Sequence, residues 1–130
     1  MKPLHFLQFP SYEFRIVYIT EAHPTDGWAI QASSQPDVNQ QKTLEERFDT
    51  AMEFKNKISD IVQAKFLVDD MDNTANITFG AIPERLAVLF DGKVQWLGGP
   101  GPFKYSVEEL ESYLSTLDGW YDDELDIWYI

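Results

Sequence analysis

Short runs of β-branched and aromatic residues mark the strands of this chain. Glu13 to Thr20 is the clearest run, and Phe66 to Val68 is a shorter apolar run that ends in two aspartates. Arg85 to Phe90 and Lys93 to Leu97 flank the dipeptide Asp91-Gly92, which tolerates the positive φ angles of a tight hairpin turn. The pattern therefore predicts two separate strands followed by a β-hairpin.

Two capping boxes mark the starts of helices, because a hydroxyl at the first position can accept from the third helical N–H while a glutamate reaches back. They are Thr43-Leu44-Glu45-Glu46 and Ser106-Val107-Glu108-Glu109, and apolar residues recur at helical spacing after each. We therefore expect amphipathic helices from Thr43 to about Val62 and from Ser106 to Leu117. One or two helical turns between Asp72 and Phe79, closed by Gly80, complete the set.

The predicted order is strand, helix, strand, short helix, hairpin and helix, which indicates an α/β fold. A hairpin that leads into a last helix after β/α units is typical of a thioredoxin-like mixed sheet with flanking helices. We assign residues 1–117 to this domain and residues 118–130 to an acidic, aromatic C-terminal tail. The tail has five acidic residues and no basic one, together with Trp120, Tyr121, Trp128 and Tyr129. The pattern is compatible with a tail whose aromatic residues dock on the domain and with a tail that extends away from it.

Composition narrows the possible functions. The 130 residues fit one domain, and 22 acidic against 10 basic residues give a formal charge of −12. Such a charge repels a phosphate backbone, so nucleic acid is a poor partner. The apolar runs are too short for a membrane span or a signal peptide, which predicts a soluble chain as written. There is no cysteine, which excludes thiolate catalysis and Cys-ligated metal sites within these residues.

Five blocks of sequence, in order and with sensible gaps, resemble the iodothyronine deiodinases. The resemblance covers roughly Val17 to Leu117. The blocks are Val17 to Trp28, Thr43-Leu44-Glu45-Glu46-Arg47, Val68 to Asn76, Ile82-Pro83-Glu84-Arg85-Leu86 and Gly98-Gly99-Pro100-Gly101-Pro102-Phe103.

The resemblance implies reductive deiodination of thyroid hormones by a selenocysteine selenolate, with a thiol reductant as the second partner. An iodothyronine-like small molecule is then the substrate, and a homodimer is possible. No residue of this chain can serve as the nucleophile, because its oxygens are too hard and methionine is a thioether. The alternative is a redox-inactive thioredoxin-like module that binds an iodinated phenol or a protein partner.

The resemblance also implies site residues. His23 matches the family's active-site histidine, and Glu84 is the second candidate for proton transfer. Pro83 stands where thioredoxin-like folds keep a cis-proline beside the site. Arg85 and Trp28 are the further candidates for substrate binding. We expect no metal site, because Asp69, Asp70 and Asp72 lack the spacing of a calcium loop and suit helix capping.

Two residues depart from the family pattern. Gln41 stands where family members commonly have a second histidine, and Pro100 stands where some have a basic residue. Met1 to Leu7 resembles the end of the family's selenocysteine motif and the helix after it. We therefore expect the chain to lack the first central strand, which would leave the Glu13–Thr20 strand with unpaired backbone groups and favour marginal stability or self-association. Some family members carry a membrane anchor, so the localisation stays open.

Overall fold

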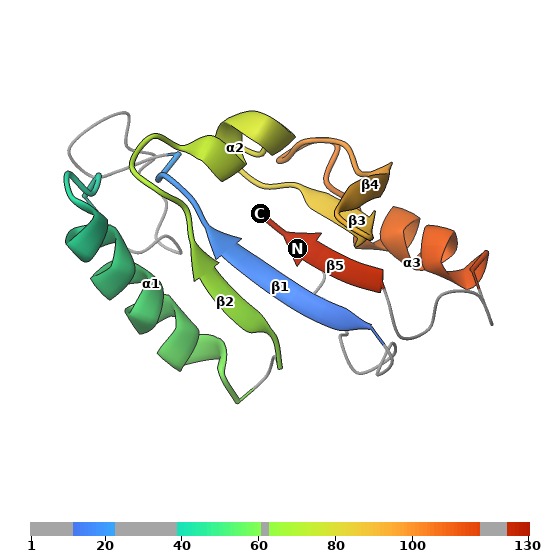
Figure 1. Ribbon diagram of the computed structural model, residues 1–130, viewed down its shortest axis with the longest axis horizontal. Coiled ribbons are helices and arrows are strands. Elements are labelled where there is room, and N and C mark those ends of the chain that lie inside the picture. The colour runs from blue at the N-terminus through green and yellow to red at the C-terminus, as the bar shows by residue number, and fades with distance from the viewer. Residues whose placement is uncertain (1–11, 23–38, 61–62, 118–124) are drawn as a thin grey trace.

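The computed structural model describes residues 12–22, 39–60, 63–117 and 125–130. These ranges contain five strands and three helices (Figure 1). Their order and bounds are β1 (Glu13–Tyr18), α1 (Leu44–Ile58), β2 (Lys65–Val68), α2 (Thr74–Phe79), β3 (Leu86–Phe90), β4 (Lys93–Leu97), α3 (Val107–Ser115) and β5 (Leu125–Tyr129). The fold is a mixed α/β sheet with flanking helices, as a thioredoxin-like chain requires.

The five strands form one sheet in the order β2-β1-β5-β3-β4. β1 is parallel to β2 and to β5, whereas β3 is antiparallel to β5 and to β4. The hairpin between β3 and β4 turns at Asp91 and Gly92, whose φ angles of 49° and 71° are those that the Asp-Gly signal predicts. The predicted strands and hairpin are therefore confirmed, with ends shifted by one or two residues.

The last strand occupies the centre of the sheet. β5, which lies in the stretch assigned to a tail beyond the domain, pairs with β1 on one side and with β3 on the other. Leu125 and Ile127 are almost completely buried, and Figure 1 shows the strand between its two neighbours. The expectation that the Glu13–Thr20 strand faces unpaired backbone groups is therefore wrong, because β5 supplies the missing partner.

Side chains of successive residues alternate between the two faces of the sheet, and the helices divide accordingly. On one face α3 packs Leu110 and Leu114 against a core that includes Phe14, Leu86 and Ile127. On the opposite face α2 contributes Ala75 and Phe79, which pack against a smaller cluster of Val17, Ile19, Ala81 and Ile130. The two clusters hold β5 from both sides.

The hydroxyl half of each predicted capping box is confirmed. The Thr43 hydroxyl accepts from the Glu46 N–H at 3.1 Å, and the Ser106 hydroxyl accepts from the Glu109 N–H at 3.2 Å. The Glu46 carboxylate reaches back to the N–H of Lys42, one residue before the cap.

The apolar stripe of α1 is less buried than its pattern predicts. Leu44 and Phe48 are 47% and 51% exposed, because the helix turns Ala51 and the buried Arg47 toward the sheet. α1 also ends at Ile58, earlier than predicted, and residues 61–62 lie outside the described ranges.

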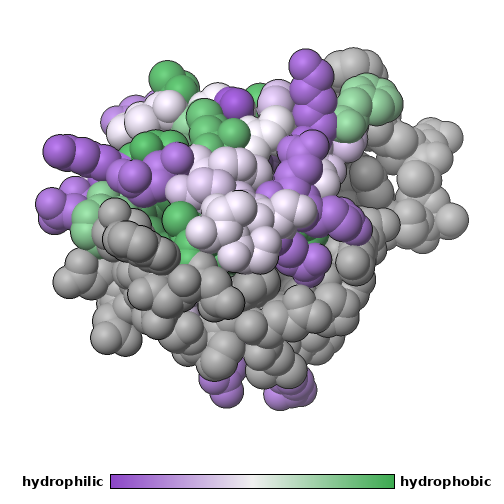
Figure 2. Space-filling model, turned by 90° about the vertical axis from the view of Figure 1, so that its right-hand side faces the viewer, coloured by the Kyte–Doolittle hydropathy of each residue, from purple (hydrophilic) through white to green (hydrophobic). Residues whose placement is uncertain are grey.

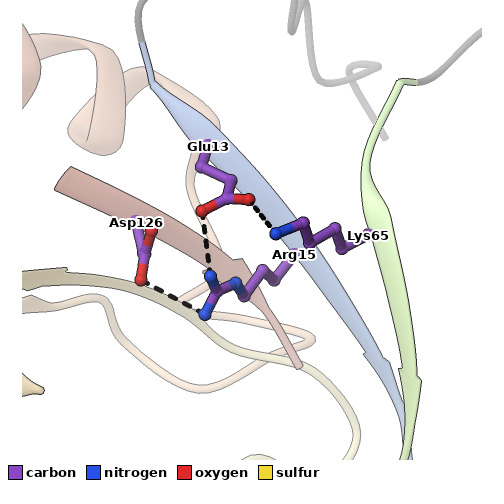
Figure 3. Close-up of polar contacts among 4 residues, drawn as sticks. All are labelled: Glu13, Arg15, Lys65 and Asp126. Carbon is purple, nitrogen blue, oxygen red and sulfur yellow. Dashed lines mark hydrogen bonds and ion pairs between the residues drawn. The ribbon is translucent and has the colours of Figure 1, made fainter. Parts of the chain in front are cut away.

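An ionic network crosses the three parallel strands on the face that α2 partly covers. Arg15 of β1 pairs with Glu13 at 2.9 Å and with Asp126 of β5 at 3.2 Å, and Lys65 of β2 pairs with Glu13 (Figure 3). The Arg15 guanidinium also lies over the ring of Trp128, 5.4 Å from its centroid. Because these contacts join specific register positions, they favour the observed alignment of β5 on β1.

The surface around α3 mixes polar and apolar groups. Figure 2, which looks at the molecule from that side, shows hydrophilic side chains interspersed with smaller hydrophobic ones. In the described ranges, no helix combines the length and the apolar character needed to cross a bilayer.

Candidate functional site

A pocket of about 400 Å³ opens where β1 and β5 end. Its walls come from the end of β1 and the residues after it, from α1, from the loop before β3 and from the end of β5. The lining residues are Ile16, Val17, Tyr18, Ile19, Thr20, Glu21, Ala22, Phe54, Pro83, Glu84, Tyr129 and Ile130. The volume suits a small organic ligand, and the lining combines apolar walls with a few polar groups.

Pro83 and Glu84, two of the predicted site residues, both line this pocket. The Ile82–Pro83 peptide bond is cis, as the resemblance implies. The Glu84 carboxylate accepts from the Tyr129 hydroxyl at 3.4 Å, a contact that joins residues 45 positions apart. The structure thus brings two predicted residues together with a tyrosine that the sequence had not singled out.

A second carboxylate, Glu21, lies in the same lining. It accepts a hydrogen bond from the Tyr18 hydroxyl. Burial raises the pKa of Glu21 above its ordinary value, and the neighbouring Gln41 side chain and the Arg47 charge oppose that rise. Gln41, the residue in place of the family's second histidine, is itself 5% exposed. This wall therefore offers a half-buried carboxyl that holds its proton to higher pH than a surface glutamate.

Arg85 does not belong to the pocket lining. Its Nε donates to the carbonyl of Gly98 at 2.7 Å, and its Nη1 donates to the carbonyl of Phe79 at 2.9 Å. These bonds join the loop before β3 to the end of β4 and to the end of α2. The guanidinium therefore stabilises the frame of the site, and its role in binding substrate stays a prediction.

The stretch from Gly98 to Pro102 forms a wall behind Glu84. The Gly101 N–H donates to the Glu84 carbonyl at 2.9 Å. A Cβ on Gly101 would lie 2.7 Å from Cγ and 2.8 Å from Oε1 of Glu84, so only glycine fits beside this side chain. The turn thus fixes one flank of the carboxylate.

The aspartates after β2 cap α2. The buried Asp69 accepts from the N–H groups of Ala75 and Asn76 at 2.9 and 3.0 Å. Asp72 accepts from the N–H and the hydroxyl of Thr74. The predicted capping use is therefore confirmed for Asp69 and Asp72, whereas Asp70 accepts from the N–H of Met71, which lies before the helix.

Arg47 is the buried cation near the site. Only 1% exposed, it donates to the carbonyls of Asp69 and Asp70 at 3.2 and 2.7 Å. It joins α1 to the turn after β2 and places a positive charge near Glu21. The sequence pattern places Arg47 in a family block but gives no sign that it is buried.

His23 and Trp28, the other two predicted site residues, lie outside the described residues. The residues that sequence reasoning missed are Tyr18, Glu21, Phe54 and Tyr129, all of which line the pocket. The signal that could have revealed Tyr129 is the run of β-branched and aromatic residues from Leu125 to Ile130, which is typical of a strand and would place Tyr129 on the face of Ile127.

The chemistry open to this lining is proton transfer and hydrogen bonding. The polar groups of the partly apolar lining include two carboxyl groups and two phenols, those of Glu21, Glu84, Tyr18 and Tyr129. The sulfur atoms of the described residues are those of Met52 and Met71, and neither lines the pocket. The described lining can bind an aromatic ligand and handle a proton, and it offers no soft nucleophile.

The family model described as "Iodothyronine deiodinase" matches residues 7–118. Type II iodothyronine deiodinases from Rattus norvegicus and Homo sapiens are each 38% identical over 104 residues, or 78% of this chain. The protein of that name from Petromyzon marinus is 38% identical over 105 residues, or 81% of this chain. These alignments cover 39%, 38% and 36% of the relatives, so the chain spans less than two fifths of their length. β5 lies beyond the residues matched by the family model.

Proposed function

Because this chain belongs to the iodothyronine deiodinase family, we propose that its pocket binds an iodinated phenol of the thyroid-hormone type during reductive deiodination. In this proposal the 130 residues supply the binding walls and a proton-handling carboxyl. They do not supply the atom that takes the iodine. The position of Pro83 and Glu84 in one pocket is the observation that carries the proposal.

Reductive deiodination replaces a carbon–iodine bond by a carbon–hydrogen bond, so it consumes two electrons and one proton and releases iodide. A selenolate or thiolate from outside these residues would supply the soft nucleophile, and a thiol reductant would supply the electrons. Glu84, which lines the pocket beside Pro83, is our candidate for delivering the proton to the ring carbon. His23 keeps its predicted role as a second proton-handling group.

The apolar part of the lining is suited to the aromatic rings of such a ligand. Phe54 reaches the pocket from α1, and its ring contacts Tyr18 with 6.3 Å between the centroids. Aromatic rings gain from such packing beyond the burial of their area. Glu21 and Glu84 add polar groups to the lining of the same pocket.

The absence of cysteine favours a second candidate, a redox-inactive module that holds an iodinated phenol or a protein partner. Both candidates require the pocket to bind an aromatic ligand, and they differ in whether iodide is released. A binding experiment therefore tests what the two share.

We would titrate the intrinsic tryptophan fluorescence of the 130-residue chain with thyroxine. Phe54→Ala should weaken binding by about tenfold, because it removes an aromatic wall. The matched control is Phe48→Ala, the same change on the same helix at a residue that is 51% exposed and outside the pocket. Circular dichroism checks that each variant is folded. Failure of the wild-type chain to saturate, or equal losses in both variants, would contradict the proposal.

A further inference from the structure

The contact between Tyr129 and Glu84 brings β5 into the site. The Tyr129 hydroxyl donates to Oε2 of Glu84 at 3.4 Å, and both side chains line the pocket. β5 lies outside the residues matched by the family model, so neither the resemblance nor the comparisons assign Tyr129 a role. The contact is a property of this chain's own last strand.

Backbone pairing between the strands brings the two residues close together. Arg85, which follows Glu84, donates its N–H to the carbonyl oxygen of Ile130 at 2.8 Å, and the Ile130 N–H donates to the Arg85 carbonyl at 2.9 Å. Because β3 and β5 are antiparallel, the next pair along the ladder is Leu86 opposite Tyr129. Glu84 lies two residues before Leu86, at the diagonal position from Tyr129 that long side chains can reach across.

Each side chain of the pair is also supported from its far side. The Tyr129 ring meets the Tyr105 ring edge-on, with 6.1 Å between centroids and an interplanar angle of 85°. The Glu84 side chain lies against Gly101, where a Cβ would come within 2.8 Å of Oε1. The hydroxyl and the carboxylate therefore have little freedom to move apart.

We propose that Tyr129 is a positioning residue that orients the Glu84 carboxyl in the pocket, so that β5 completes the site as well as the sheet. The contact itself rests on the geometry above. Its purpose, the orientation of the carboxyl toward a ligand, rests on the proposed function. Burial raises the pKa of the Tyr129 phenol far above its ordinary value, with the charge of Glu84 adding to the rise. The hydroxyl consequently remains a donor throughout the neutral range, and it engages one oxygen of the Glu84 carboxyl.

A double-mutant cycle on ligand affinity tests the positioning role. Tyr129→Phe keeps the ring and removes the donor, and Glu84→Gln keeps the shape and removes the charge. Hydrogen bonds to charged groups justify an expected loss of about tenfold in thyroxine affinity for each single variant. The double variant should lose about tenfold as well, well short of the hundredfold that independent residues would give. Additive losses would overturn the proposal.

Tyr105→Phe is the matched control for the loss of a tyrosine hydroxyl in the same aromatic layer. Tyr105 contacts the Tyr129 ring but does not line the pocket. We expect its affinity to stay within about twofold of the wild type. A loss equal to that of Tyr129→Phe would assign the effect to packing and would overturn the positioning role.

A measurement without ligand separates this inference from the proposed function. With ¹³Cζ-labelled tyrosine, the Tyr129 signal should move on Glu84→Gln substitution, because the carboxylate oxygen that accepts from its hydroxyl is replaced by an amide. If thyroxine does not bind but this shift is present, the proposed function fails and the contact stands. If the Tyr129 signal is the same in the wild type and in Glu84→Gln, the positioning role is contradicted.

Discussion

Arg85 and Ile130 exchange both of their backbone hydrogen bonds, at 2.8 and 2.9 Å, and so join the loop that carries Pro83 and Glu84 to the end of the last strand. The pairing continues along the ladder between β3 and β5, where Leu86 is opposite Tyr129. Pro83 and Glu84, which the family resemblance singles out, therefore depend for their position on β5, a strand outside the residues that the resemblance covers.

Removal of residues 118–130 should abolish cooperative folding. β5 pairs with β1 and β3, and its loss would leave two strands with unpaired backbone groups in the middle of the sheet. Urea denaturation followed by circular dichroism measures this, and we expect no sigmoidal transition for the shortened chain. A transition with the wild-type midpoint would show that β5 is dispensable.

A point substitution tests the same dependence without shortening the chain. Ile127 is 1% exposed, so Ile127→Ala should lower the free energy of unfolding by about 2–5 kcal/mol. Val94 on the edge strand β4 is 49% exposed, and Val94→Ala should cost less than about 1 kcal/mol. Equal losses at the two positions would contradict a central, buried β5.

Much of the fold follows from local sequence signals. The hydroxyl caps of Thr43 and Ser106, the Asp-Gly hairpin and the strand from Glu13 each depend on a few neighbouring residues, and the structure forms all of them. Gly80 ends α2 in the left-handed conformation with a φ of 56°, as its position after Phe79 predicts.

The placement of β5 could not be read in the same way. Its partners in the sheet lie far away in sequence, and the acidic residues just before Leu125 make the short apolar and aromatic run resemble part of a solvated tail. Register between distant strands is a tertiary property, and the ion pair of Arg15 with Asp126 that favours it has no local signature.

Only part of the candidate site could be predicted, because the rest also depends on tertiary packing. Pro83 and Glu84 are adjacent in one block, so a resemblance finds them together, and the pocket contains both. Tyr129 and Phe54 reach the pocket only through the packing of β5 and α1. Arg85, from the same block, instead bonds backbone carbonyls outside the lining.

Gly101→Ala should displace Glu84. The added methyl would lie 2.7 Å from the Cγ of Glu84, so the side chain or the turn must move. Overpacking of this kind lowers the free energy of unfolding by about 1–3 kcal/mol. Thyroxine affinity should fall in parallel, by about tenfold. The same change in a Glu84→Ala background should cost much less, and an equal cost there would contradict the close contact.

The pH dependence of stability should report the burial of Glu21. Burial raises its pKa above the ordinary value of 4.5, so the folded chain keeps this proton at pH values where the unfolded chain has lost it. The free energy of unfolding therefore loses this contribution as the pH rises from 4.5 through the raised folded pKa. Glu21→Gln cannot ionise, and it should gain stability over the wild type in neutral solution relative to acid solution.

Urea midpoints at several pH values test this expectation. Glu53→Gln, at an exposed position of α1, gives the reference for losing one surface charge. If the stability difference between Glu21→Gln and the wild type is independent of pH, the buried position of Glu21 is contradicted.

Arg47→Met should destabilise the junction between α1 and the turn after β2. The substitution keeps the apolar stem but leaves the carbonyls of Asp69 and Asp70 without their donor. We expect a loss of about 1–3 kcal/mol in the free energy of unfolding, the cost of unsatisfied buried groups. Lys57→Met on the exposed side of the same helix should change it by less than about 0.5 kcal/mol. Calorimetry that finds equal effects would contradict a structural role for Arg47.

The most direct test of the claim that these residues lack the nucleophile is iodide release from thyroxine by the purified 130-residue chain with an excess of a phosphine reductant, which supplies electrons without a thiolate. The chain contains no cysteine, and its methionine thioethers cannot act as thiolates. We predict that the ligand quenches tryptophan fluorescence while iodide stays at the level of the protein-free control. Iodide release beyond one equivalent per chain would contradict the account, because the polypeptide would then contain its own nucleophile.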